Sequence, residues 1–124
     1  MDRENEKIIE DIEENMKKGV LEMLVLKALC GKDLYGYEMA DYVNAQSDGK
    51  IRIKEGSLYG PIYRLIDRGC ISETKVLVGK RRTRIYFHIE QQGIDYLKTL
   101  TEVYRRVNEG VNQFLNGGDR NDAL

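Results

Sequence analysis

Four cationic side chains lie within five residues of this sequence, a pattern suited to binding phosphate. They are Lys80, Arg81, Arg82 and Arg84. Because neighbouring positive charges repel one another, such a run is stabilised when an anion or an acidic partner lies close by. Ammonium and guanidinium groups both form strong hydrogen bonds to phosphate oxygens. A solvated loop can also carry such a run, so its position in the fold decides between the two interpretations.

A second group of polar side chains precedes this run at helical spacing. Hydroxyl groups bind phosphates or the edges of bases, and an arginine fits phosphate or guanine. The residues that we predict to contact a ligand are Ser57, Tyr59, Gly60, Tyr63 and Arg64. The alternative is that the tyrosines cap the core with their hydroxyls in water, while Arg64 pairs with Asp67 or Glu38.

The net charge of −1 conceals an uneven distribution of charge along the chain. Between Lys50 and Arg84 there are ten Lys or Arg residues and three Asp or Glu residues, a local charge of +7, which leaves −8 for the rest. We expect the basic part to face a polyanion. Lys54 forms a smaller cluster with Lys50 and Arg52, which would steer a nucleic-acid backbone.

The composition supplies little for catalysis or metal binding. The single histidine is His88 and the two cysteines are Cys30 and Cys70, so a four-cysteine metal site and a disulfide framework are excluded by number. We expect no cofactor, no metal and no enzymatic activity, because no nucleophile, base and oxyanion donor are arranged together. His88 is expected to be structural or solvent-facing. Both cysteines lie in apolar stretches, so we expect them to behave as small hydrophobic residues. The alternative is that one of them senses redox conditions.

The length of 124 residues predicts one domain with one core. The sequence holds no run of about 18 apolar residues, and its acidic start lacks the features of a secretory signal. We therefore expect a cytoplasmic protein without membrane contact.

The apolar pattern predicts a mainly α chain. Residues 1–17 predict a charged helix with one apolar stripe, and 20–30 predict a buried central helix. The stripe consists of Ile8, Ile9, Ile12 and Met16. Asp33 is the expected N-cap of a third helix, in which Gly36 would permit the close approach of a crossing helix.

A fourth helix is predicted from Ser57, its expected N-cap, to Gly69. Pro61 has no N–H, so we expect an irregular first turn or a slightly later start. Before this helix, the alternation in Ile51–Ile53 predicts a very short strand. After it, alternating residues predict a small β-hairpin whose tip, Gly79–Arg82, is basic.

Residues 91–115 predict a long helix with an apolar seam at alternating intervals of three and four residues, which is typical of coiled coils. The seam consists of Leu97, Leu100, Tyr104, Val107, Val111 and Phe114. Together with the stripe on 1–17 it exceeds what one small core covers, so we expect a homodimer. The alternative is that the two helices cover each other within one chain. Residues 116–124 are polar and are expected to be disordered.

Three helices followed by a hairpin is the order of a winged helix-turn-helix, whose last helix of the trio enters the DNA major groove. Specific residues in order support this fold: Gly19-Val20-Leu21-Glu22, Leu34-Tyr35-Gly36-Tyr37-Glu38, Gly56-Ser57-Leu58-Tyr59, Arg64-Leu65 and Gly69-Cys70-Ile71. With these motifs the chain resembles the PadR family of bacterial transcriptional regulators from about Gly19 to Gly93. It departs from the family pattern at Gly60, which precedes Pro61, and at Glu90, where a threonine commonly caps the last helix.

The resemblance implies a DNA-binding domain over 18–90, flanked by N-terminal and C-terminal dimerisation helices. It implies a regulator, most simply a repressor, that binds a pseudo-palindromic operator in double-stranded DNA as a homodimer. It also implies an unidentified small-molecule effector, since family members often respond to aromatic or drug-like molecules. The rival hypothesis is a winged-helix module that binds an acidic partner protein without DNA.

Overall fold

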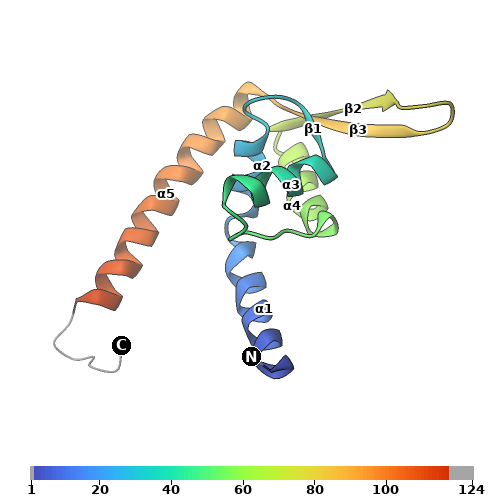
Figure 1. The fold of residues 1–124 in the computed structure, drawn as a ribbon. Coiled ribbons are helices and arrows are strands. Elements are labelled where there is room, and N and C mark those ends of the chain that lie inside the picture. Colours follow the sequence, from blue (N-terminus) through green and yellow to red (C-terminus); the bar gives the residue numbers. More distant parts are fainter. Residues whose placement is uncertain (1, 118–124) are drawn as a thin grey trace.

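The computed structural model describes residues 2–117, which form five α-helices, one 3₁₀ turn and three β-strands. Helices α2, α3 and α4 gather beneath a small sheet, from which β2 and β3 project to one side (Figure 1). Helices α1 and α5 extend away from this core and lie apart from each other. The mainly helical winged helix-turn-helix that the sequence predicts is confirmed.

The two terminal helices are long and amphipathic. Helix α1 (Arg3–Lys18) begins at Asp2, whose carboxylate accepts a hydrogen bond of 2.9 Å from the Asn5 N–H. Acidic residues occupy its first turn and lysines its last, which complements the helix dipole. Helix α5 (Gln91–Asn116) continues one residue into the expected tail, and the part of that tail beyond Gly117 lies outside the described residues.

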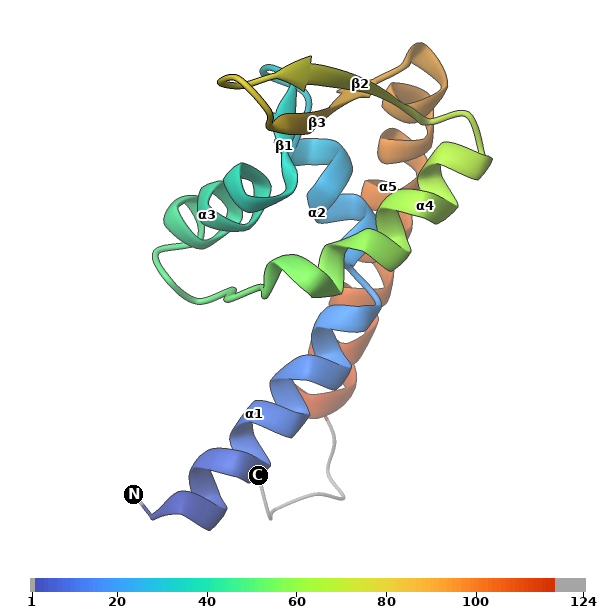
Figure 2. The same ribbon diagram turned by 90° about the vertical axis from the view of Figure 1, so that its right-hand side faces the viewer.

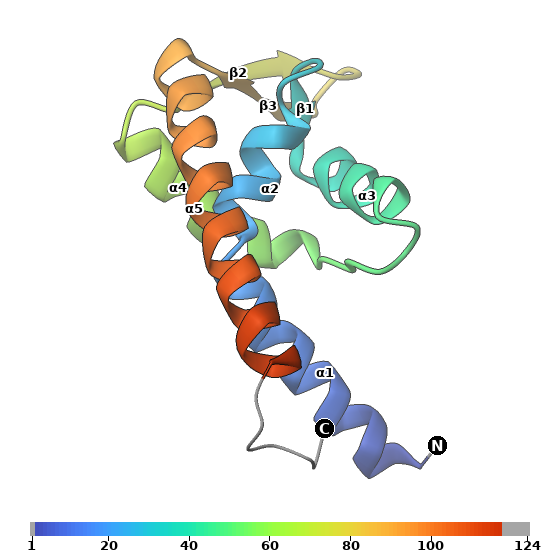
Figure 3. The ribbon, with the colours of Figure 1, turned by 90° about the vertical axis from the view of Figure 1, so that its left-hand side faces the viewer.

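Helix α2 (Leu21–Ala28) is the centre of the core. Its neighbours α3 (Gly36–Gln46), α4 (Tyr59–Asp67) and α5 all contact it. Figure 3 shows α5 running across α2 on one side of the molecule. Four of the eight residues of α2 are buried, Leu26 completely so, and burial of one such side chain stabilises the fold by about 1.5–3 kcal/mol.

The sheet has three antiparallel strands in the order β1-β3-β2. Strands β2 (Ile71–Leu77) and β3 (Thr83–Ile89) form the predicted hairpin over seven paired residues. The third strand, β1 (Leu34–Tyr35), pairs with the inner half of β3, where Leu34 lies opposite Phe87. Both of these side chains are buried, so this end of the sheet joins the helical core.

The expectation that Asp33 caps the third helix is wrong. The inner edge of β3 offers backbone hydrogen bonds to the residues just before the helix, so Leu34 and Tyr35 become a strand instead. The N-cap position therefore falls on Tyr35, whose N–H donates to the Glu38 carboxylate at 3.2 Å. Asp33 lies too far upstream to cap α3.

Ser57 is likewise not the N-cap of the fourth helix. It lies within a 3₁₀ turn, Glu55–Leu58, and α4 starts at Tyr59. Pro61 is then the third residue of α4, where an N–H has no partner within the helix, so its absence costs nothing. The late, irregular start is confirmed. Gly69 ends the helix as predicted, with a φ of 76° in the left-handed region.

Ile51–Ile53 is not a strand. The alternation in this loop turns Ile51 and Ile53 towards the core, where both are half-buried, while Arg52 stays exposed. The Arg52 carbonyl accepts a hydrogen bond from the Lys17 ammonium of α1. Core packing and this side-chain contact hold the loop without a partner strand.

The two cysteines differ, although both occupy apolar stretches. Cys70 is buried, as predicted, and burial raises the pKa of its thiol. Cys30 is exposed, which the sequence interpretation missed. Helix α2 ends at Ala28, so Cys30 lies beyond the packed part of the helix.

Truncating the centre of α2 tests this description of the core. Leu26→Ala should lower the free energy of unfolding by about 2–5 kcal/mol, because it leaves a cavity among fully packed side chains. Leu77→Ala on the projecting hairpin is the matched control, since Leu77 is 66% exposed, and it should change stability by less than about 0.5 kcal/mol. Urea denaturation measures both, and a mild Leu26→Ala variant would contradict a core centred on α2.

Candidate nucleic-acid interface

Helix α4 presents one buried face and one polar face. Its buried side chains, together with that of Leu58, pack into the core, whereas Gly60, Tyr63 and Arg64 are exposed. Ser57, in the preceding 3₁₀ turn, is exposed as well. Figure 2 shows α4 running obliquely below the sheet. Four residues predicted from the sequence therefore lie in solvent on one helix and the turn before it.

Tyr59 is half-buried and packs against the core at the edge of this face. Its hydroxyl donates a hydrogen bond of 2.7 Å to Glu55, and this bond together with burial raises the pKa of Tyr59 to about 12. A Cβ at Gly36 would lie 2.7 Å from the hydroxyl oxygen. Gly36 therefore permits a close approach, but the approaching group is the Tyr59 side chain and not the crossing helix that the sequence analysis expected.

Arg64 is exposed and only loosely paired. Its Nε lies 3.9 Å from a carboxylate oxygen of Glu22 on α2, and among the described residues it forms no ion pair with Asp67 or Glu38, the partners in the alternative interpretation. Pairs of this kind at the surface contribute little energy, about 0–1 kcal/mol. The guanidinium is therefore available to an external anion or base.

The hairpin ends in a tight basic turn. Gly79 has a φ of 84°, which a glycine adopts without strain, and the Val78 N–H donates to the Arg82 carbonyl at 2.8 Å. Lys80, Arg81 and Arg82 are all exposed at this tip. We call these three residues the wing tip. They lie on the hairpin that projects furthest from the helices (Figure 1).

Arg84 lies on β3 near the wing tip, opposite Val76, and its side chain reaches back towards β1. Its guanidinium lies 4.1 Å from the centre of the Tyr35 ring, and hydrogen bonding to Tyr86 raises its pKa. The rings of Tyr35 and Tyr86 meet edge to face, with their centres 5.5 Å apart. The sequence analysis placed Arg84 correctly on the hairpin but missed its contact with Tyr35, because the pairing of β1 with the distant β3 leaves no local signal.

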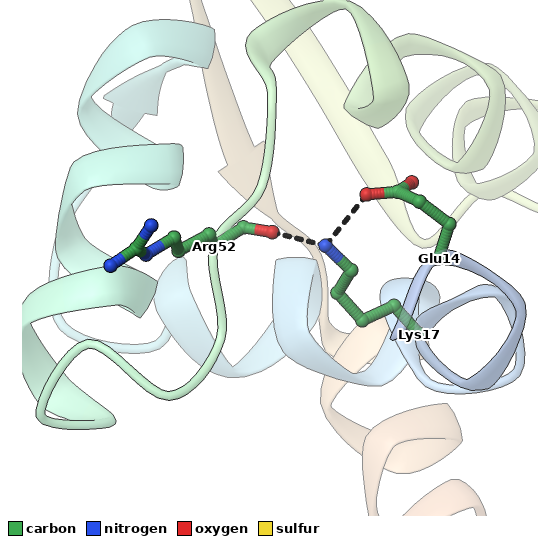
Figure 4. Close-up of polar contacts among 3 residues, drawn as sticks. All are labelled: Glu14, Lys17 and Arg52. Carbon is green, nitrogen blue, oxygen red and sulfur yellow. Dashed lines mark hydrogen bonds and ion pairs between the residues drawn. The ribbon is translucent and has the colours of Figure 1, made fainter. Parts of the chain in front are cut away.

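The loop that contains Lys54 faces an acidic helix. Lys17 on α1 donates to the Arg52 carbonyl and to Glu14, the latter at 2.8 Å (Figure 4). The Lys17 hydrogen bond holds the pKa of Glu14 below its usual value, and Lys54 acts in the same direction. A groove of about 950 Å³ lies between α1 and this loop. Part of the loop's positive charge is therefore balanced within the protein.

The apolar stripe of α1 and the outer part of the α5 seam lie in solvent. The exposed predicted residues are Ile8, Ile9, Ile12, Met16, Tyr104, Val107, Val111 and Phe114, the last 85% exposed. Leu97 and Leu100 instead pack against the core of their own chain. Val103 and Leu115 add to the exposed surface of α5. Because α1 and α5 diverge (Figure 1), they do not cover each other within the chain.

The helix trio and the wing match a known family. The model of the transcriptional regulator PadR-like family matches residues 25–99, from within α2 to the first turns of α5. The chain belongs to this family. In this fold α4 holds the position of the recognition helix of a winged helix-turn-helix, and β2 and β3 form the wing.

Solved PadR-like structures have the same fold. A transcriptional regulator from Clostridium thermocellum is 27% identical, with a TM-score of 0.75 over 82% of this chain and 99% of its own. A PadR family regulator from Eggerthella lenta is 23% identical, with a TM-score of 0.77 over 94% and 100%. Bacillus subtilis PadR in complex with operator DNA is 21% identical, with a TM-score of 0.60 over 64% and 46%. The last two structures show similarity of fold only, because their sequence identity to this chain is low.

Within residues 2–117 of this PadR-like regulator, no group of three or more His, Cys, Asp and Glu side chains could hold a metal ion. Over the same range, no helix combines the length and the apolar character needed to cross a bilayer.

His88 has a structural partner that the sequence did not reveal. Its Nδ1 lies 2.7 Å from the Asp33 carboxylate, which joins the loop before β1 to strand β3. This hydrogen bond raises the pKa of His88, with Glu90 contributing in the same direction. The two residues are 55 positions apart, so no local spacing could have predicted the pair.

The Asp33–His88 pair should make a small part of the stability depend on pH. A raised pKa means that the stabilisation is fully present below the unfolded-state value of about 6.5 and is lost as the pH rises through the folded value. NMR titration should place the His88 midpoint above 6.5 in the wild type and closer to it in Asp33→Asn. Equal midpoints in the two proteins would show that the pair does not form in solution.

Proposed function

We propose that this PadR-like regulator binds a pseudo-palindromic operator as a homodimer and represses transcription by covering a promoter. The observation that carries the proposal is the exposed polar face of α4 beside a basic wing, in a family with a member, Bacillus subtilis PadR, known in complex with operator DNA. In this proposal α4 enters the major groove and the wing follows the neighbouring phosphates.

The residues divide between reading bases and holding the backbone. Tyr63 and Arg64, exposed on α4, reach base edges in the major groove, with Gly60 leaving room for close approach. The wing tip binds phosphate or the minor groove without regard to sequence. Ser57 and Lys54 add backbone contacts. Tyr59, whose hydroxyl is engaged by Glu55, sets the start of α4 instead of touching DNA.

Arg84 acts as an anchored backbone contact. Stacking on Tyr35 restrains the guanidinium, and the residue remains half-exposed on β3. The Arg84 side chain has already lost part of its conformational entropy in the folded protein. Binding a phosphate there therefore costs less entropy than binding one at the wing tip. We therefore assign Arg84 to the same electrostatic surface as Lys80, Arg81 and Arg82.

The homodimer rests on the exposed apolar residues of α1 and α5. Several large apolar side chains on one helix face are costly to leave in water and are typical of protein interfaces. A two-fold dimer through these helices places two copies of α4 on one side, and half-sites are then expected about 10 bp apart, one turn of DNA. A protein bound across such a site excludes polymerase from it.

Substitutions should separate the two kinds of DNA contact. Arg81→Ala with Arg82→Ala should weaken selected and random duplexes equally, and should reduce the slope of log affinity against log salt from about −4 or −5 by about 2 to 4. Arg64→Ala should weaken the selected duplex by about 1–3 kcal/mol more than a random one. Anisotropy titrations over a salt series measure both effects.

Lys98→Ala, which removes a cation from exposed α5, is the control and should behave as the wild type. Equal losses on both duplexes after Arg64→Ala would make Arg64 a backbone contact. If the wild type bound no duplex even at low salt but bound an acidic protein, the operator proposal would give way to the protein-binding module.

The dimer interface is tested by placing charges in it. Val107→Glu with Val111→Glu should favour monomers, because it buries like charges across the two-fold axis. Operator affinity should fall through loss of bivalent binding. Asn108→Glu with Asn112→Glu adds the same charges to the polar flank of α5 and should remain dimeric. Analytical ultracentrifugation distinguishes the species, and a wild type that sediments as a monomer at tens of micromolar contradicts the proposal.

A further inference from the structure

The end of the recognition helix α4 is joined to the start of α5 by direct backbone contact. After Gly69 closes the helix, the Cys70 N–H donates to the Leu65 carbonyl at 2.9 Å. The Cys70 carbonyl then accepts the Glu90 N–H, also at 2.9 Å. The backbone of Cys70 therefore links the end of α4 to Glu90, the N-cap residue of α5. In Figure 2 the two helix ends lie beside each other at one edge of the molecule.

Gly93 allows the two helices to meet this closely. It is the buried residue of α5, and a Cβ at its position would lie 2.3 Å from the Cys70 carbonyl oxygen and 2.8 Å from a side-chain carbon of Ile89. The first of these neighbours is backbone and cannot turn aside. Any side chain at position 93 must therefore push α5 away from the end of α4.

We call the contact between the end of α4 and the start of α5 the joint. Gln92 contacts this joint from the solvent side. Its Nε2 donates a hydrogen bond of 2.5 Å to the Arg68 carbonyl, which is the C-cap of α4. The amide of Gln92 also packs over Gly69. The guanidinium of Arg68 in turn lies 4.7 Å from the centre of the Tyr96 ring on α5. Side chains from the first two turns of α5 thus contact both the carbonyl and the guanidinium of Arg68, at the end of α4.

We propose that Gln92 and Gly93 are positioning residues that fix the angle between the recognition helix and α5, and that they thereby set which spacing of half-sites the dimer accepts. The inference rests on the proposed homodimer. If two protomers meet along the outer part of α5, the path from one recognition helix to the other runs through two copies of this joint.

The length of α5 makes the joint a sensitive control of spacing. Its 26 residues extend about 39 Å at about 1.5 Å per residue. A change of about 10° in the angle between α4 and α5 then displaces the far end of α5 by about 7 Å. This is the length of about two base pairs at 3.4 Å each. A joint built from a backbone contact and a short hydrogen bond restricts such changes.

The experiment measures spacing preference with the full-length protein. Duplexes carry two copies of the half-site selected by the wild type, separated by spacers that differ by single base pairs, and a further duplex carries one half-site. Gln92→Ala should reduce the affinity ratio between the best spacer and its neighbours about three- to tenfold, the range expected for loss of one hydrogen bond. Affinity for the single half-site should remain unchanged, because the α4 surface is intact.

Gly93→Ala should shift the preferred spacer or remove the preference, since α5 must move. A control on the same helix keeps the interpretation specific. Gln91→Ala removes an exposed amide that bonds within α5, to Asp95. This variant should keep the wild-type spacing preference and the dimeric state.

A folded, dimeric Gln92→Ala protein with wild-type spacing discrimination would overturn the inference, even if Gly93→Ala failed to fold. Loss of single half-site affinity in Gln92→Ala would also count against it, because it would show general damage to the recognition helix. A wild type that binds duplexes without any preferred spacing would instead reject the paired half-sites of the proposed function. The two failures are therefore distinguishable.

Discussion

The structure depends on the burial of α2. A helix of eight residues does not persist alone in water, because too few hydrogen bonds offset the cost of its nucleation. It exists here because α3, α4 and α5 cover it on different sides. In doing so each of these helices commits its apolar face to the interior, which leaves the opposite face free. The polar surface of α4 is thus a direct result of the packing around α2.

The positive charges of the chain are restrained to different degrees. Arg84 stacks on a tyrosine, Arg64 lies loosely beside Glu22, and Lys17 is used to hold the Arg52 carbonyl. At the wing tip the three cations extend into solvent. A polyanion approaching this surface therefore meets long, adaptable side chains at the tip and more fixed ones near the core. Such an order suits an initial electrostatic encounter that is followed by a defined fit.

The sequence predicted the elements with strong periodicity and failed where distant residues decide the structure. Helices α1, α2 and α5, the hairpin and the buried face of α4 follow from patterns within a few turns or strands. Asp33 was misplaced because strand β1 forms only when β3, some fifty residues later, lies beside it. The pairing of Glu55 with Tyr59 and the exposure of Cys30 likewise depend on where helices end, which is the least regular feature of a sequence. The candidate site was predicted as a set of residue types, whereas the hydrogen bond from Tyr59 to Glu55 is visible only in the folded chain.

Strand β1 covers only the inner end of β3, and this short pairing leaves the outer part of the hairpin without a third strand. Beyond Tyr86 the wing is a two-stranded ribbon with open edges, and it carries the exposed apolar residues Val76 and Leu77. An open edge of this kind can pair with the same edge on another molecule and start aggregation. The arginines that flank the ribbon repel such a neighbour. The charges suited to a polyanion therefore also oppose edge-to-edge pairing between the wings of two molecules.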